Sequence, residues 1–118
     1  MNTLKRWLPF IILIVAVLIS GTYFFLRTGD SDYTPQTDDV RMIYREACAQ
    51  CHAIDGSGSG LLYPAFNSHN LSIDQIKQAI QQGDFMMPAY RKIKGDTLQE
   101  LARHVLFLSK RLKSKSEE

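Results

Sequence analysis

A long apolar run dominates the hydrophobic pattern of the chain. Residues 8–26 contain no charged side chain, and at about 1.5 Å of rise per residue a helix of this length crosses the ~30 Å hydrocarbon core of a membrane once. Lys5 and Arg6 precede the run and acidic residues follow soon after it, so the positive-inside rule predicts a cytoplasmic N-terminus. We therefore predict a single-pass anchor over residues 1–27 in the cytoplasmic (inner) membrane, in contact with lipid through residues 8–26. The rest of the chain is expected on the periplasmic, extracytoplasmic side.

A cleaved secretory signal is the alternative for this segment. The apolar part of such a signal usually covers about 7 to 15 residues and ends in a small-residue site. The nearest match is Leu18-Ile19-Ser20, in which Leu18 is too large for the position three before the cut. We favour an uncleaved anchor, and both interpretations place the remainder of the chain in an oxidising compartment.

The pattern after the anchor predicts a linker and one small domain. Residues 28–37 are polar and include Gly29 and Pro35, which is typical of a linker. The domain is expected over residues 38–113, and the polar tail over residues 114–118 is expected to fray.

Three amphipathic stripes predict three short helices in this domain. The stripes comprise Val40, Ile43, Tyr44, Ala47 and Cys48; then Ile73, Ile76 and Ile80; then Leu98, Leu101, Val105, Leu108 and Leu112. Capping-box patterns at 72–75 and 96–99 predict the starts of the second and third helices. Residues 55–70 are rich in glycine near their start and predict an irregular loop. No run alternates with a period of two residues, so the predicted fold class is all-α.

Charge makes one class of function improbable. Beyond the anchor the chain has 11 Lys and Arg residues (14 minus Lys5, Arg6 and Arg27) against 12 Asp and Glu residues. A near-neutral domain lacks the basic surface that nucleic-acid binding needs, and we expect no nucleic-acid partner.

The strongest chemical signal is the pentapeptide Cys48-Ala49-Gln50-Cys51-His52. C-x-x-C-H is the pattern at which haem is attached as haem c, with two thiols forming thioethers to the vinyl groups and the adjacent imidazole serving as an iron ligand. A bound haem would also supply apolar mass to a domain that is otherwise too small for a substantial core. We predict one covalent haem, attached through Cys48 and Cys51 and ligated by His52.

Other uses of the two cysteines are less well supported. A closed zinc site would need His52 plus the distant His69 or His104. A thioredoxin-like dithiol would need a neighbouring βαβ pattern, which is missing. A chance match without any cofactor would leave an oxidation-prone dithiol in an oxidising compartment.

The domain resembles the class I monohaem cytochromes c, a family of small all-α electron carriers, over roughly residues 39–112. The resemblance rests on the haem motif, on Tyr44 four residues before the first cysteine, and on Pro64 twelve residues after the histidine. It implies that Tyr44 packs against the last helix. It also implies that the carbonyl of Pro64 accepts the proton of the second imidazole nitrogen of His52.

The resemblance also implies the sixth iron ligand. The segment from Phe85 to Tyr90 is similar to the family's M-P-A-aromatic loop, in which Met87 would be the axial methionine. Met86 is the alternative, and both methionines could instead fill gaps in the core. Ligation through His69 is a further alternative. The short interval from His52 to Met87 departs from the family and predicts a more exposed haem.

Together these features predict a membrane-anchored carrier of single electrons between extracytoplasmic redox proteins, and not an enzyme. The alternative is a fixed haem subunit of a larger respiratory or reductase membrane complex. An open sixth position at the iron would indicate an enzyme or a ligand sensor, and the absence of haem a protein of another class. Arg91, Lys92 and Lys94 are candidates for a basic rim that attracts an acidic partner, or equally for an ordinary solvated surface.

Overall fold

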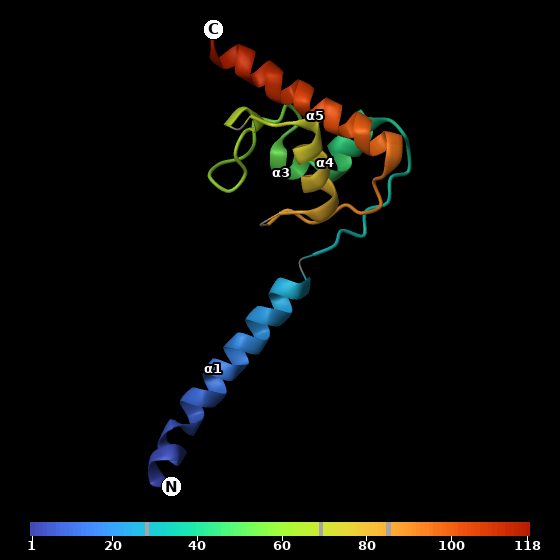
Figure 1. The fold of residues 1–118 in the computed structure, drawn as a ribbon. Coiled ribbons are helices and arrows are strands. Elements are labelled where there is room, and N and C mark those ends of the chain that lie inside the picture. The colour runs from blue at the N-terminus through green and yellow to red at the C-terminus, as the bar shows by residue number, and fades with distance from the viewer. Residues whose placement is uncertain (28, 69, 85) are drawn as a thin grey trace.

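The computed structural model describes residues 1–27, 29–68, 70–84 and 86–118. A long N-terminal helix stands apart from a small helical domain, and the two ends of the chain lie at opposite ends of the molecule (Figure 1). The helices are α1 (Asn2–Arg27), α2 (Val40–Ala47), α3 (Ala49–His52), α4 (Ile73–Gln82) and α5 (Gly95–Ser116), with a short 3-10 turn η1 (Phe66–Ser68). The described residues form isolated bridges but no strand. The all-α class is therefore confirmed.

The α1 helix has the properties of a membrane anchor. Its window of highest mean hydropathy reaches 2.4, and none of that window is buried against the rest of the molecule. Large apolar side chains along it, such as Phe10 and Phe24, are exposed. Exposed apolar surface on this scale is stable only against lipid or another protein, so the helix fits a membrane span.

The break between α2 and α3 falls inside the haem motif. Asp39 caps α2 by accepting a hydrogen bond from the N–H of Arg41 at 3.0 Å. The helix ends at Ala47 with Cys48 as its C-cap, whose N–H donates to the Tyr44 carbonyl, and the next short helix carries Cys51 and His52. The helix predicted from the stripe that runs from Val40 to Cys48 is confirmed, and the haem motif begins at its C-cap.

The second predicted helix start is correct and the third is wrong. At α4 the Ser72 side chain accepts from the Gln75 N–H while the Gln75 side chain accepts from the Ser72 N–H, so the capping box is complete. At α5 the N-cap is Lys94, without a side-chain cap, and Asp96 lies inside the first turn. In the first turn the negative charge of Asp96 still interacts favourably with the positive end of the helix dipole, which explains why an acidic residue suits the position.

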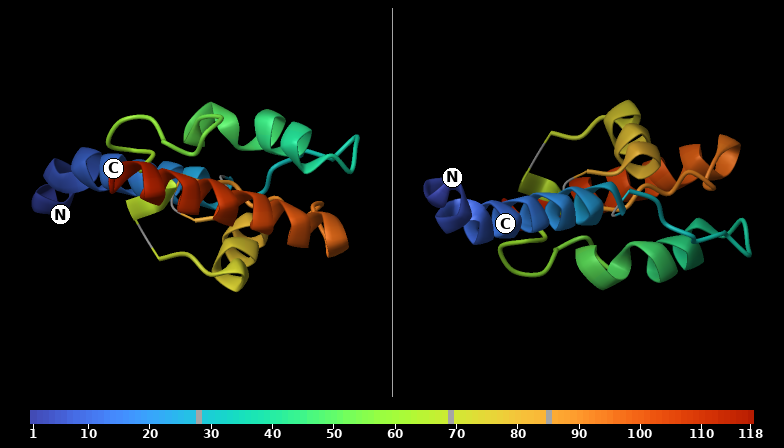
Figure 2. Two further views of the ribbon diagram at one scale, coloured as in Figure 1. Left: turned by 90° about the horizontal axis from the view of Figure 1, so that it is seen from above. Right: turned by 90° about the horizontal axis from the view of Figure 1, so that it is seen from below.

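The α5 helix forms the centre of the domain. It runs between α2 and α3 on one side and α4 on the other (Figure 2). The buried core joins α2, α4 and α5 and comprises Ile43, Tyr44, Cys48, Ile76, Ile80, Ile93, Leu98, Leu101, Ala102, Val105 and Leu108. The helix then continues to Ser116, so the expected fraying of the tail does not match the structure. Lysines in its last turn favour this extension because they oppose the negative end of the dipole.

Candidate functional site

A mostly apolar cavity of about 360 Å³ opens beside the haem motif. Its wall brings together segments that are distant in the chain: the end of α2, α3, the loop before η1, α4, the segment after α4, and α5. The predicted site residues Tyr44, Cys48, Cys51, His52, Pro64 and Met87 all line it, and so does Met86. The fold thus gathers every predicted site residue at one hollow.

The two cysteines differ in their surroundings. Cys48 is 9% exposed and belongs to the core, and burial, with a smaller contribution from Cys51, raises the pKa of its thiol to about 12. Cys51 is half-buried. Both border the cavity, so a flat ring lying in it could be joined at two points.

His52 has an unsatisfied polar atom in the wall of the cavity. Its Nδ1 is buried and finds no hydrogen-bond partner in the described part of the chain. Burial lowers the pKa of the imidazole, which favours the neutral form that can bind a metal. The ring packs on Phe66, with centroids 4.9 Å apart. A half-buried imidazole whose lowered pKa favours the neutral form, in the same cavity wall as two thiols, fits the donor set of haem c.

The bond expected between His52 and Pro64 is not formed in this structure. Pro64 borders the same cavity, yet no hydrogen bond joins its carbonyl to Nδ1 of His52. The role of Pro64 stays a prediction from the resemblance.

Tyr44 supports the turn that carries His52. It is 2% exposed, and its hydroxyl donates to the Ala53 carbonyl at 2.7 Å. Ala53 has φ 60° and ψ 163°, a region costly for a residue with a side chain, on the order of 1–3 kcal/mol. The hydrogen bond from Tyr44 helps to hold this backbone directly after His52. The ring of Tyr44 also meets His104 of α5 edge-on at 5.3 Å, as its expected packing on the last helix requires.

The two methionines occupy different environments. Met87 packs against the buried core. Met86 is 54% exposed and has φ 62°. Beyond them, Tyr90 turns back into the domain, where its hydroxyl donates to the Ala47 carbonyl at 2.8 Å and its N–H to the Ile80 carbonyl at 2.7 Å. The segment after α4 is thereby fastened to both α2 and α4.

A metal site built from side chains alone is not supported. Among the described residues no three His, Cys, Asp or Glu side chains are grouped closely enough to hold a metal ion. His104 lies against Tyr44, half-buried on the flank of α5, as expected of a flank residue. His69, the other zinc candidate and a possible iron ligand, lies outside the described residues.

Protonation of His104 is expected to weaken the domain. Burial, assisted by Arg41 and opposed by Asp39, lowers the pKa of His104 below its ordinary value of 6.5. Below that value the unfolded chain binds more protons than the folded one, so stability falls as the pH falls. We expect His104→Gln to lose less stability than the wild type in urea unfolding of the haem-loaded protein between about pH 8 and about pH 5. Equal losses in both proteins would contradict the assignment.

Two contributors to the site were missed by sequence reasoning. Phe66 lies two residues after Pro64 and packs on His52, but an aromatic residue within an irregular loop has no period that predicts its direction. Residues 29–33, expected to be a linker, instead pair with the segment after Met87. Backbone pairing of this kind has no side-chain signature.

Comparison with known proteins shows the family to which the chain belongs. A family described as "Cytochrome C oxidase, cbb3-type, subunit III" matches residues 35–105. The match covers more than half of the chain and includes the haem motif, all of α2, α3 and α4, and about half of α5. No curated protein matches the chain. The chain therefore belongs to this cytochrome c family and is a monohaem c-type cytochrome with a part in electron transfer.

Proposed function

We propose that the protein is a membrane-anchored electron carrier in which Cys48 and Cys51 would hold one haem covalently and His52 and Met87 would ligate its iron. The observation that carries the proposal is that all four residues line one mostly apolar cavity. Bound haem supplies a one-electron iron couple, whose potential His/Met ligation raises relative to other ligand sets. The protein makes and breaks no substrate bond.

The chain's own residues prepare this cavity. The thiols of Cys48 and Cys51 would fix the position of the haem, and the neutral imidazole of His52 would offer a nitrogen lone pair to its iron. Pro64 is proposed to accept the proton on the other imidazole nitrogen, which would keep the ring in one tautomer and raise its basicity. Apolar walls from Ile76, Ile80 and Val105 exclude water.

Met87 is a better candidate ligand than Met86. Its side chain is packed against the core beside the cavity, so little rotamer freedom remains to be lost on ligation. The side chain of Met86 is more exposed, and its positive φ marks the turn. A soft thioether suits haem iron in either case.

The two methionines can be separated by substitution. We expect Met87→Ala to lose the methionine-to-iron charge-transfer band of the ferric protein and to lower the reduction potential, because a thioether ligand raises it. Met86→Ala is the matched control and should keep both properties. Loss of the band in Met86→Ala alone would exchange the roles, and absence of the band from the wild type would refute His/Met ligation.

Partners are proposed to be extracytoplasmic redox proteins that share the membrane. A tether raises the effective concentration of such partners, so a small and weak docking surface suffices. The expected basic rim is partly engaged within the molecule, since Arg91 pairs with Asp30 and Lys92 donates to the Asp32 carbonyl. Lys94 keeps an exposed position in the remaining part of that rim.

A fixed subunit of a larger membrane complex is the second candidate function. The description of the matching family as an oxidase subunit favours it. Purification in mild detergent distinguishes the two, because a subunit would co-elute with other membrane proteins in constant proportion. A cytochrome that elutes alone and still exchanges electrons with added redox proteins would favour the free carrier.

A further inference from the structure

The segment that follows α1 is hydrogen-bonded to the domain. Residues 29–33, here called the strap, lie along residues 86–91, here called the methionine loop. The Ala89 N–H donates to the Gly29 carbonyl at 3.0 Å, and the Ser31 N–H donates to the Ala89 carbonyl at 2.9 Å. These two bonds form a parallel bridge centred on Asp30 and Ala89.

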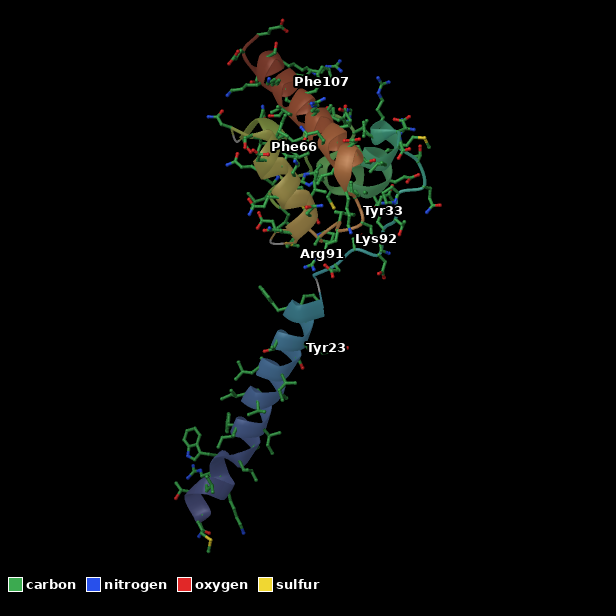
Figure 3. All side chains as sticks on the ribbon, turned by 45° about the vertical axis from the view of Figure 1, so that its right-hand side comes forward. Tyr23, Tyr33, Phe66, Arg91, Lys92 and Phe107 are labelled. Atoms are coloured by element: carbon green, nitrogen blue, oxygen red, sulfur yellow. The ribbon has the colours of Figure 1, made fainter. Side chains whose placement is uncertain are left out.

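Side chains reinforce the pairing along the strap. Arg91 lies 3.0 Å from an Asp30 carboxylate oxygen, and the Lys92 ammonium donates to the Asp32 carbonyl at 3.2 Å. Tyr33 meets Tyr90 edge-on with centroids 6.1 Å apart. Figure 3 shows Tyr33, Arg91 and Lys92 gathered at the end of the domain nearest to α1.

The far end of the strap is fixed to α2. The Tyr33 hydroxyl donates to a carboxylate oxygen of Glu46 at 2.8 Å, and burial together with this carboxylate raises the pKa of Tyr33 to about 12. The hydroxyl therefore stays a donor through the neutral range. The strap thus links α2 to the methionine loop, through Tyr33 at one end and its backbone pairs with Ala89 at the other. Tyr90 of the loop forms a second, direct link to α2 through the Ala47 carbonyl.

The backbone pairs contribute more than the ion pair. The Arg91 and Asp30 side chains are 70% and 61% exposed, and exposed pairs contribute only about 0–1 kcal/mol. Ala89, by contrast, is 1% exposed, and a buried amide left without its partner is costly. The position of Ala89, two residues after Met87, therefore depends on the strap.

We infer that the strap is a positioning element for the axial methionine, so that residues next to the membrane anchor hold Met87 at the cavity. This inference rests on the proposed ligation by Met87. Release of the strap would free the loop on one side, and the Met87 thioether would then yield more readily to a competing ligand. In this way the strap would couple the end of α1 to the position of Met87, the proposed sixth ligand.

Imidazole binding to the ferric, haem-loaded full-length protein tests the inference. Ser31→Pro removes the N–H that donates to Ala89, whereas Ser31→Ala keeps it. We expect imidazole to displace the methionine with about three- to tenfold higher apparent affinity in Ser31→Pro than in Ser31→Ala, the range that one hydrogen bond accounts for. Gln36→Pro is the matched control, because Gln36 is exposed and its N–H makes no hydrogen bond in the described structure; it should bind imidazole like the wild type.

Hydrogen exchange provides a second readout that does not depend on the iron. The Ala89 amide should exchange at least about tenfold faster in Ser31→Pro than in Ser31→Ala, because its acceptor lies on the strap. Should Ser31→Pro fail to fold, the double variant Tyr33→Ala with Arg91→Gln releases the strap through side chains, with an expected rise in imidazole affinity of about twofold or more.

The outcomes separate the inference from the function on which it rests. A wild-type protein without the methionine band would refute the proposed ligation. A wild-type band together with equal imidazole affinities in Ser31→Pro, Ser31→Ala and the double variant would overturn the inference alone.

Discussion

Simultaneous replacement of Cys48 and Cys51 with alanine is expected to yield a chain without covalent haem and without a stable domain. Both cysteines line the cavity, so no thioether could form in the variant. Among the described residues the buried core comprises 11 side chains, and a domain of this size with an open apolar cavity has little stability to lose. A haem stain of a denaturing gel should be blank, and the far-ultraviolet circular dichroism should keep mainly the signal of α1.

Single substitutions separate attachment from packing in this experiment. Cys51 is half-buried and outside the core, so Cys51→Ala should keep one thioether, the haem stain and most of the helix signal. Cys48 is part of the core, so Cys48→Ala removes packing as well as a thioether. A positive haem stain in the double variant would contradict attachment at these positions.

Gly83→Ala is expected to have the largest effect of any single glycine substitution near the methionines. Gly83 has φ +71°, and a Cβ at this position would lie 2.6 Å from the Met87 carbonyl oxygen and 3.0 Å from the Ala89 nitrogen. Both neighbours are backbone atoms, so Met87 and Ala89 would have to move together. We expect a loss of stability of at least about 1–3 kcal/mol from the backbone conformation alone, with the clash added to it.

Gly95 offers a matched control for the same substitution. Its φ is +60°, but a Cβ there would meet nothing within 4 Å. Gly95→Ala should therefore show the conformational cost without displacement of Met87. Urea unfolding and the ferric spectrum measure the two effects: Gly83→Ala should be the less stable protein and should alone lose the methionine band. Equal spectra and equal stabilities would show that the loop tolerates the added atom.

Sequence patterns predicted the elements whose residues carry local signals. The stripe from Val40 to Cys48 and the capping box at Ser72 led to α2 and α4 because their determinants lie within one or two turns of helix. The haem motif likewise places three chemical groups within five residues. The family match agrees with these local signals.

The rest of the site depends on contacts that local patterns do not encode. The start of α5 was misplaced because Asp96 satisfies a capping pattern, whereas the actual N-cap is Lys94. The difference between Met86 and Met87 depends on how the turn after Gly83 packs on the core. The backbone hydrogen bonds of the strap can be donated by any residue except proline, so they leave almost no signal in the sequence.

With α1 in a membrane, the strap would also determine the distance between the haem domain and the lipid surface. The α1 helix ends at Arg27, and Gly29 of the strap already pairs with Ala89, so one residue of the sequence separates the end of α1 from the strap. A single extended residue covers about 3.5 Å. With α1 in a membrane, this short connection would keep the domain close to the lipid surface and would restrict its range of motion. In that case we expect its redox partners to carry their redox centres close to the lipid surface, because a centre far above the membrane would stay out of its reach.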